Sequence, residues 1–514
     1  MTELYCLGID IGTSGTKAVL FTQSGKAVRS KTEEYPLYQP QNGWAEQDPL
    51  DWWDAVQKSV AGLISESRIA PADIKAVGLS GQMHGLVMLD ANGNPLRRAI
   101  IWCDQRTARE CEEMTALIGR RRLIEITANP ALTGFTASKI LWVRKNEPEI
   151  YEKCAHILLP KDYIRYRLTG EFMTDVSDAS GMQLMDVPKR TWSSEVLNKL
   201  EIDGSLLPQI YESPDRAGVV SAKAAAATGL CAGTVVAGGA GDNAAAAVGM
   251  GVVKPGSAFM TIGSSGVIYA VTDKVSIDLD GRVNTLCASV PGGWTVMSCT
   301  QAAGLSLTWF RDNFCLKEVL AAEKLGVDVY DVMGGLAEEV GIGARGLLFL
   351  PYLMGERAPH PDALCRGVFF GLSAIHGAAH MIRAIMEGVA YSQWECLDVF
   401  AEMGVAAEDM MICGGGGRSR LWRQILADTL GCTMSSVRHE EGPALGAAIL
   451  GAVAAGLYGS VGEACERIVI REKLSDPIEA NRMRYKGYFD LYKKLYVNLR
   501  GDFETLSSLQ ENSK

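Results

Sequence analysis

The chain has 514 residues, a length that predicts two domains rather than one core. Its composition, 47% hydrophobic and 21% charged with a mean hydropathy of +0.06, is typical of a soluble globular protein. The net charge of −10 argues against a nucleic-acid surface, and no apolar run is long enough to predict a membrane span. The N-terminus shows no secretory signal, and thirteen cysteines without a CxxC pair indicate a reduced, cytoplasmic protein.

The first eighty residues alternate between strands and a helix. Leu4–Ile11 and Thr16–Phe21 are predicted strands joined in a hairpin, and Ala27–Tyr35 is a third strand. A helix is predicted over Leu50–Ser67, where a proline and acidic residues stand near the start. A further strand is predicted over Ile74–Leu79, and strands and helices continue to alternate along the chain. This pattern is typical of an α/β fold.

Two stretches half a chain apart read almost alike. Residues 10–19 read DIGTSGTKAV, and residues 261–270 read TIGSSGVIYA. Each half also contains a strand that runs into a glycine-rich turn, at residues 77–85 and 410–419. Such a coarse repeat predicts one α/β unit used twice, with a cleft between the copies. The boundary between the two units is expected at residues 249–251.

The first hairpin turn is rich in glycine and hydroxyl residues. Its backbone amides would form an anion nest, and Thr13, Ser14 and Thr16 add hydroxyl donors, so we expect a phosphate-binding loop; a plain hairpin turn is the alternative. The loop fits neither the Walker motif nor the dinucleotide motif, because GK[ST] is missing and a strand follows. Asp10, which stands where the second copy has Thr261, indicates a cation beside the phosphates, and we expect Mg²⁺ held through water.

Several further segments complete this pattern in a fixed order. They read GGAGDNAAAAVGMG at 238–251, TIGSSG at 261–266, PYLMGERAP at 351–359, RGVFFGLSAIHGAAHMIRAIMEGVAYS at 366–392 and GGGGRSRLWRQILAD at 414–428. Together with DIGTSGTKA they resemble the FGGY carbohydrate kinases over nearly the whole chain. GQMHG at 81–85 and WCDQR at 102–106 are similar to the xylulokinase branch of that family.

The resemblance implies an α/β fold of two duplicated actin-like, ribonuclease H-like ATPase domains around a central cleft. Residues 1–251 would form an N-terminal domain with the sugar site, the first phosphate motif and the catalytic aspartate. Residues 252–514 would form a C-terminal domain with the second phosphate motif and the adenosine motif. The implied ligands are ATP, Mg²⁺ and a small-molecule sugar. The oligomeric state stays open, a homodimer included.

Asp242 follows a glycine run and begins a helix of small residues. From the residues alone it reads as a helix-capping aspartate. The resemblance implies instead that Asp242 is the catalytic base, which accepts the proton of a sugar hydroxyl, with Asp10 as the second catalytic carboxylate. The helix N-terminus is expected to lower the pKa of Asp242 and keep it ionised. Asn243 is expected to hold a neighbouring hydroxyl.

The resemblance also assigns residues to the two substrates. Met83 and His84 are expected to contact the sugar through the thioether and the imidazole, with a structural histidine as the alternative. Trp102, Asp104 and Arg106 are further sugar candidates, with a salt-bridged loop as the alternative. The nucleotide is expected to contact, besides the hydroxyl residues of the first loop, Thr261, Gly263, Ser264, Gly304, Thr308, Gly415, Gly416 and Ser419.

These expectations describe an ATP-dependent sugar kinase. D-Xylulose, phosphorylated at its terminal hydroxyl to the 5-phosphate, is the leading acceptor. L-Ribulose, L-xylulose, a polyol and gluconate stay open, because one altered pocket side chain changes preference by only about 1–3 kcal/mol. A nucleotide-gated, actin- or Hsp70-like protein without catalysis is a remote alternative, since the chain has no appended substrate-binding domain and carries the GQMHG turn.

Overall fold

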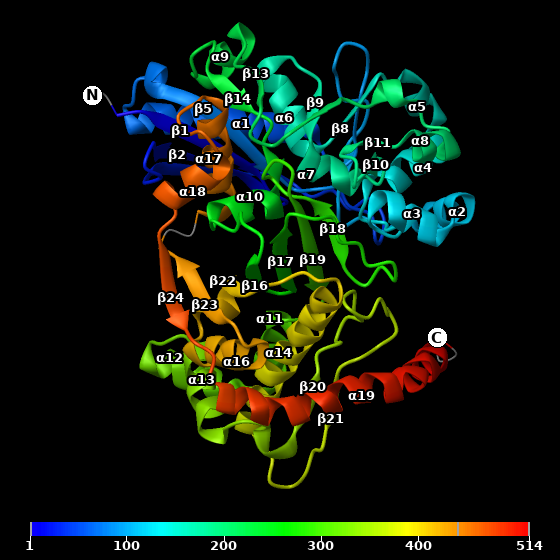
Figure 1. The fold of residues 1–514 in the computed structure, drawn as a ribbon, viewed down its shortest axis with the longest axis vertical. Coiled ribbons are helices and arrows are strands. Elements are labelled where there is room, and N and C mark those ends of the chain that lie inside the picture. Colours follow the sequence, from blue (N-terminus) through cyan, green and yellow to red (C-terminus); the bar gives the residue numbers. More distant parts are fainter. Residues whose placement is uncertain (1–2, 439–440, 512–514) are drawn as a thin grey trace.

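The computed structural model describes residues 3–438 and 441–511 and contains two seven-stranded sheets. Figure 1 shows the sheets in two lobes, one above the other, each covered by helices. The first sheet is formed by β3 (Ala27–Glu34), β2 (Gly15–Thr22), β1 (Tyr5–Ile11), β5 (Ile74–Gly81), β14 (Val235–Ala237) and β13 (Arg216–Val219) in that order, with β15 (Ala240–Gly241) also beside β5. The three predicted N-terminal strands and the strand before GQMHG are therefore confirmed.

The second sheet repeats the centre of the first. Its order is β18 (Asn284–Cys287), β19 (Trp294–Thr300), β17 (Gly266–Thr272), β16 (Ser257–Ile262), β22 (Asp409–Cys413), β23 (Thr433–Val437) and β24 (Arg471–Ser475). β16 pairs antiparallel with β17 and parallel with β22, as β1 pairs antiparallel with β2 and parallel with β5. The α/β fold with two related sheets is confirmed by this shared topology.

Short strand pairs and helices surround the two sheets. The pairs are β4 (Glu46–Gln47) with β7 (Ala99–Ile100), β6 (Val87–Leu89) with β8 (His156–Leu158), β9 (Met173–Asp175) with β12 (Gln209–Tyr211), β10 (Met185–Asp186) with β11 (Thr191–Trp192), and β20 (Leu348–Leu350) with β21 (Val368–Phe370). The helices of the first half are α1 (Pro49–Ser67), α2 (Ala108–Ile118), α3 (Arg120–Thr127), α4 (Thr136–Asn146), α5 (Pro148–Lys153), α6 (Pro160–Thr169), α7 (Val176–Ala179), α8 (Ser194–Leu200), α9 (Ala222–Thr228) and α10 (Asp242–Gly249). Those of the second half are α11 (Gly304–Phe314), α12 (Leu316–Leu325), α13 (Val329–Val340), α14 (Ala378–Glu402), α15 (Gly415–Arg418), α16 (Arg420–Leu430), α17 (Gly442–Ala454), α18 (Val461–Ile468) and α19 (Glu479–Glu511).

Helix α1 confirms the predicted first helix. Asp48 caps it by accepting a hydrogen bond from the Leu50 amide, and Pro49 occupies its first turn, where no amide hydrogen is needed. Its buried face includes Trp52, Val56 and other apolar residues that pack on the first sheet. None of the helices within 3–438 and 441–511 combines the length and the apolar character that a membrane span requires.

Helix α17 joins the two lobes. It belongs to the second half of the chain, yet it packs on β1 and β5 of the first sheet and against α10 (Figure 1). The approach is so close that a Cβ added at Gly8 or Gly78 would lie 1.9 Å or 1.7 Å from a carbonyl oxygen of α17. Buried side chains of both halves form one apolar cluster around this contact. The predicted division at residue 251 stays a prediction, and α17 crosses it.

The close contact at Gly78 predicts a large effect of a single methyl group. Gly78→Ala places its Cβ against the carbonyl oxygen of Ala447, a backbone atom that cannot rotate away. We expect a destabilisation of roughly 3 kcal/mol, which a lowered thermal unfolding midpoint would report. Gly487→Ala on the exposed face of α19, where nothing lies within 4 Å of the added Cβ, is the matched control and should not lower the midpoint. An unchanged midpoint for Gly78→Ala would contradict the packing of α17.

Candidate active site

The first predicted phosphate loop joins β1 to β2, and its carbonyl groups are held by glutamine side chains. Gln82 Nε2 donates to the Gly12 carbonyl at 3.3 Å, and Gln47 Nε2 donates to the Thr13 carbonyl at 2.6 Å. In the described part of the chain, the amides of Thr13 and Ser14 have no hydrogen-bond acceptor. Because its carbonyls accept hydrogen bonds from the protein while two amides stay unbonded, the loop offers hydrogen-bond donors to an anion.

The second predicted phosphate loop, between β16 and β17, is held by the N-terminus of α11. The amide of Gly304 donates to the Gly263 carbonyl at 2.7 Å, and the Ala303 amide donates to the Ser264 carbonyl at 2.9 Å. A Cβ at Gly304 would lie 2.5 Å from the Gly263 oxygen, so this position requires glycine. Gly304 therefore holds the loop in place through its amide. Thr261, at the base of the loop, has its hydroxyl 3.0 Å from the Cys413 sulfur.

The predicted adenosine segment lies beside this second loop. β22 runs parallel to β16 and leads into α15, which contains Gly415 and Gly416. A Cβ at Gly416 would lie 2.2 Å from the side chain of Ile262, whereas one at Gly415 would meet nothing within 4 Å. Gly415 thus borders open space next to the phosphate loop, as a nucleotide contact would require.

Three other predicted nucleotide contacts have their hydroxyl groups in structural positions. Ser419 caps α16, because its Oγ accepts the Trp422 amide at 3.3 Å. Thr308 Oγ1 lies 2.9 Å from the Tyr330 hydroxyl. Thr16 is fully buried in β2. The contacts of Ser419 and Thr308 and the burial of Thr16 leave the three hydroxyl groups less available to a nucleotide than the residues alone indicated.

Two carboxylates meet where three neighbouring strands end. Asp10 stands near the end of β1 and pairs in register with Ser80 of β5, whose Oγ donates to Asp10 Oδ1 at 2.8 Å. Asp242 follows β15, which also pairs with the end of β5, and begins α10. Asn243 donates to Asp242 Oδ1 from its amide at 2.7 Å and from its side chain at 3.0 Å. The parallel strands thus bring together two acids that are 232 residues apart.

Burial controls the protonation of both acids. Loss of hydration raises the pKa of Asp10, although Ser80 and Lys17 oppose the change. Burial, followed by the repulsion of Asp10, raises the pKa of Asp242 to about 7. The expectation that the helix N-terminus would lower this pKa is therefore wrong, because the hydrogen bonds from Asn243 do not offset the lost hydration. The two partly buried carboxyl groups form a donor set that fits a hard cation such as Mg²⁺.

Met83 lies beside the loop that carries Asp242. Its sulfur is 3.9 Å from Asn243 Nδ2, and a Cβ at Gly241 would lie 2.8 Å from Met83 Cγ. The GQMHG turn after β5 and the start of α10 therefore share one surface. Met83, Asp242 and Asn243, which the sequence assigned to sugar binding, are brought together.

His84 is held in an unusual backbone conformation with a defined ring. Its φ of 67° lies in the left-handed region, and Lys139 Nζ donates to its carbonyl at 2.9 Å. The ring Nδ1 lies 3.1 Å from the Gly181 carbonyl oxygen, which can only accept, so Nδ1 carries the hydrogen. Burial and the Lys139 charge lower the pKa of His84 to about 3. The imidazole is therefore neutral, and Nε2 is an acceptor.

Trp102 contacts the phosphate loop. Its Nε1 donates to Thr13 Oγ1 at 2.9 Å, and 38% of the residue is exposed. Trp102 was predicted as a sugar contact, and the structure instead places its indole against the first phosphate loop. It covers the loop from the side of the first lobe.

Asp104 and Arg106 form a buried ion pair. Arg106 donates to both carboxylate oxygens of Asp104 and reaches Glu46 Oε1 at 2.9 Å. Its guanidinium lies 3.6 Å from the ring centre of Trp44 and 4.8 Å from that of Trp142. The polar atoms of both residues are thus engaged within the first lobe. This arrangement favours the salt-bridged loop over the predicted sugar contact, and it engages the half-buried Trp44 with Arg106.

Sequence reasoning missed three residues that shape this site. Ser80 was visible as the residue before GQMHG, but only its register with Asp10 gives it a role. Lys139 supports His84 from 55 positions away, and no local pattern marks it. Gly181 allows the imidazole to approach, because a Cβ there would lie 2.4 Å from the ring. Its only signal was a serine–glycine pair in a helical stretch.

Comparisons with known proteins agree with this geometry. Residues 5–249 match the N-terminal domain of the FGGY family of carbohydrate kinases, and residues 258–455 match its C-terminal domain. Xylulose kinase of Bacillus subtilis is 38% identical over 508 residues, covering 99% of this chain and 100% of that protein. The structure of xylulose kinase from Rhodospirillum rubrum has a TM-score of 0.89 at 30% identity, covering 97% and 100% of the two chains. A gluconate kinase from Lactobacillus acidophilus has a TM-score of 0.90 at 26% identity, covering 98% and 100%. The chain belongs to the FGGY family of carbohydrate kinases.

Proposed function

We propose that this chain transfers the terminal phosphoryl group of ATP to the terminal hydroxyl of D-xylulose, giving D-xylulose 5-phosphate and ADP. The observation that carries the proposal is the meeting of Asp242, Asn243 and Met83 at the ends of three strands, next to a loop with unbonded amides. Relatives named xylulose kinases, at up to 38% identity over almost the whole chain, support the acceptor. The proposed division of labour is sugar binding by residues 1–251 and most nucleotide contacts by residues 252–514.

Asp242 is the proposed general base. A carboxylate beside the sugar hydroxyl accepts its proton while the oxygen attacks the terminal phosphorus of ATP and the bond to ADP breaks. A base functions best when its pKa lies near the working pH, and burial raises the pKa of Asp242 to about 7. Asp10 is the proposed residue for holding Mg²⁺, which when bound would neutralise phosphate charge. Asn243 orients the base through two hydrogen bonds.

The remaining proposed contacts separate the sugar from the nucleotide. Met83 offers a thioether to the carbon face of the sugar, and the neutral His84 accepts a hydroxyl hydrogen at Nε2. Thr13, Ser14, Gly263 and Ser264 line the two phosphate loops. Gly415 leaves space for the adenosine. A cytoplasmic location, expected from the cysteine content, belongs to the same proposal.

A panel of acceptors tests the function directly. With ATP and Mg²⁺, we expect ADP release to depend on D-xylulose, with a kcat/KM at least ten-fold above those for L-ribulose, L-xylulose, a polyol or gluconate. A coupled ADP assay measures these rates, and mass spectrometry of the product identifies a sugar monophosphate. A higher kcat/KM for gluconate or another acceptor would overturn the D-xylulose assignment. ADP release that ignores every sugar would overturn the kinase assignment.

Asp242→Asn tests both the contribution of the carboxylate to turnover and its effect on the stability of the fold. We expect turnover to fall by about 10²–10⁴ while ATP binding persists, because the proton acceptor is lost. Folding raises the pKa of Asp242 from its ordinary value of 3.8 to about 7. The ionised side chain therefore destabilises the fold by an amount that grows above about pH 4 and is complete above about pH 7. The variant should unfold at a higher temperature than the wild type at pH 8 and at a similar temperature at pH 4.

Asp273→Asn, on the exposed surface, controls for the loss of a negative charge and should change neither quantity. Near-normal turnover of Asp242→Asn would remove Asp242 from the mechanism. An unfolding difference that does not depend on pH would contradict the raised pKa.

His84→Asn tests the sugar contact without straining the backbone, since asparagine tolerates the left-handed conformation at this position. We expect the KM for the sugar to rise about ten-fold, the scale of one lost hydrogen bond with its unpaired partner, and the KM for ATP to stay nearly constant. His156→Asn, where the ring stacks on Phe172, is the control. Equal changes in both KM values would mean that His84 supports the cleft as a whole.

A further inference from the structure

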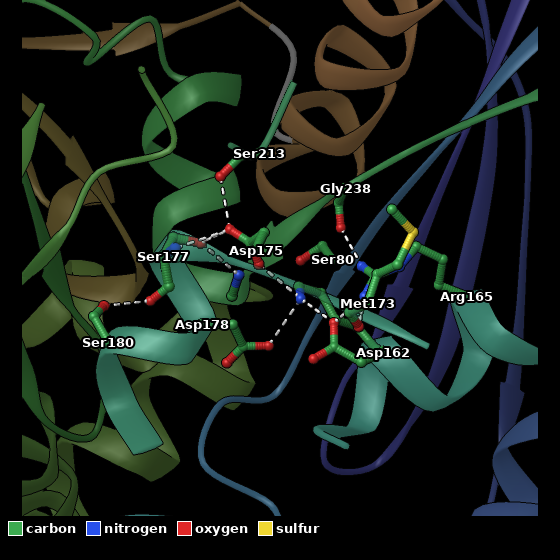
Figure 2. A network of polar contacts seen from close by, with 12 residues as sticks. Ser80, Asp162, Arg165, Met173, Asp175, Ser177, Asp178, Ser180, Ser213 and Gly238 are labelled. Atoms are coloured by element: carbon green, nitrogen blue, oxygen red, sulfur yellow. Dashed lines mark hydrogen bonds and ion pairs between the residues drawn. The ribbon is translucent and has the colours of Figure 1, made fainter. Parts of the chain in front are cut away.

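Behind the loop that carries Asp242 lies a fully buried cluster of five ionisable side chains. Lys161, Asp162 and Arg165 come from α6, and Asp175 and Asp178 come from the end of β9 and from α7 (Figure 2). Lys161 Nζ lies 2.6 Å, 2.7 Å and 3.2 Å from oxygens of the three carboxyl groups. Arg165 lies 2.8 Å from Asp162. Below, these five residues are called the Lys161 cluster.

The Lys161 cluster is a closed ionic unit rather than a metal site. Its three carboxyl groups converge within reach of a single ion, but the ammonium of Lys161 occupies the point where they converge. Burial raises the pKa of Asp178 above its usual range, which favours the neutral acid and leaves two carboxylates to balance the two cations.

The cluster is bonded to the catalytic loop at two points. Arg165 donates to the carbonyl of Gly238. Asp175 Oδ2 accepts the Ser177 hydroxyl at 2.6 Å and the Ser177 amide at 2.9 Å. The hydroxyl oxygen of Ser177 in turn accepts a hydrogen bond from the amide of Gly241, the residue before Asp242, at 3.3 Å. Figure 2 shows the contact of Arg165 with the Gly238 carbonyl and the contact between Asp175 and Ser177.

The hydrogen bond to Gly241 is directional because Asp175 fixes the Ser177 hydroxyl. A free serine hydroxyl rotates, and it can donate to or accept from the same neighbour. Here its hydrogen is committed to Asp175, so only a lone pair faces the Gly241 amide. Ser213 donates to the same carboxylate oxygen at 2.7 Å and holds Asp175 from the opposite side. The orientation of the Gly241 amide thus depends on the charged Asp175 carboxylate as well as on packing.

Burying five ionisable groups stabilises a fold less than apolar packing of the same volume would. Such a cluster is therefore expected to hold other residues in place. Through Gly241, the residue that it holds is Asp242. A displacement of about 1 Å at a reacting group can lower a rate about 10²-fold. The proposed base is the first residue of α10, so its place depends directly on the backbone of Gly241.

We propose that Ser177 is a positioning residue for Asp242, and that Asp175 and Lys161 orient its hydroxyl so that the Gly241 amide, and with it the base, is held at one place. The inference rests on the proposed function, since it takes Asp242 as the base. It adds a part of the chain, residues 161–178, that the sequence assigned neither to a substrate nor to the phosphate motifs.

Ser177→Ala tests the inference in two backgrounds. In the otherwise wild-type chain we expect kcat to fall about ten-fold or more, with the KM for ATP unchanged. In the Asp242→Asn chain, Ser177→Ala should cause no further loss of the residual turnover, because a residue that acts through the base has nothing left to position. A residue that only supports the fold would lower turnover by the same factor in both backgrounds.

Ser180→Ala is the matched control. Ser180 is buried in the same segment, and its hydroxyl donates to the Ser177 carbonyl at 2.8 Å and accepts the Cys287 amide at 3.1 Å, so its bonds avoid the catalytic loop. We expect its kcat to stay within about two-fold of the wild type. If Ser177→Ala does not fold, Ser213→Ala removes another hydrogen bond to the Asp175 carboxylate and should also lower kcat.

The outcomes separate the inference from the proposed function. Equal losses from Ser177→Ala in both backgrounds, or an unchanged kcat in the first, would overturn the positioning role while Asp242 keeps its own. Near-normal turnover of Asp242→Asn would overturn the proposed base and the inference with it. If the panel identifies a different acceptor sugar, the same cycle is run with that sugar, and a difference between the backgrounds still supports the inference.

Discussion

The contact between α10 and α17 is the constraint on which the rest of the site depends. α10 begins with Asp242, and α17 packs against it so closely that a Cβ at Gly446 would lie 1.8 Å from the Ala245 carbonyl. The same α17 lies on β1, the strand that carries Asp10, through the equally close approach at Gly8. One helix of the second half therefore fixes two acids of the first half relative to each other. Backbone contacts of this kind leave no freedom for side chains to adjust.

Asp242 and Asp175, two acids of the first lobe, lie in opposite electrostatic environments. Asp242 is partly buried, with neutral donors and a second acid nearby, and loss of hydration raises its pKa to about 7. Asp175 lies behind it, bonded to an ammonium group and to three donor groups of two serines, Ser177 and Ser213. The first environment leaves a carboxylate that binds a proton readily, as a base must. The second gives a fixed charge that can orient neighbours, and the structure connects the two through one serine.

Much of the fold was predictable because its signals are local. Strand alternation, the hairpin turn and the repeated DIGTSG and TIGSSG stretches each depend on a few adjacent residues, and the two sheets follow them. The expected pKa of Asp242 was wrong because burial depends on which helix covers the loop. Asp104 and Arg106 could not be separated from a sugar site, since an ion pair and a polar ligand contact use the same residue types. Ser177 was missed because its partner Gly241 is 64 residues away.

The conformation of His84 bears on the choice between a sugar and a sugar acid. The Gly181 carbonyl fixes the ring hydrogen on Nδ1, and burial lowers the pKa of the imidazole to about 3, so Nε2 keeps its lone pair at any physiological pH. A lone pair attracts the hydrogen of a hydroxyl group and repels a carboxylate oxygen. A ketose presents only neutral hydroxyl and carbonyl groups, whereas gluconate presents a charged carboxylate at one end. For an acceptor whose far end meets His84, this protonation state supports the proposed D-xylulose over gluconate, a distinction that the fold, shared with a gluconate kinase, does not supply.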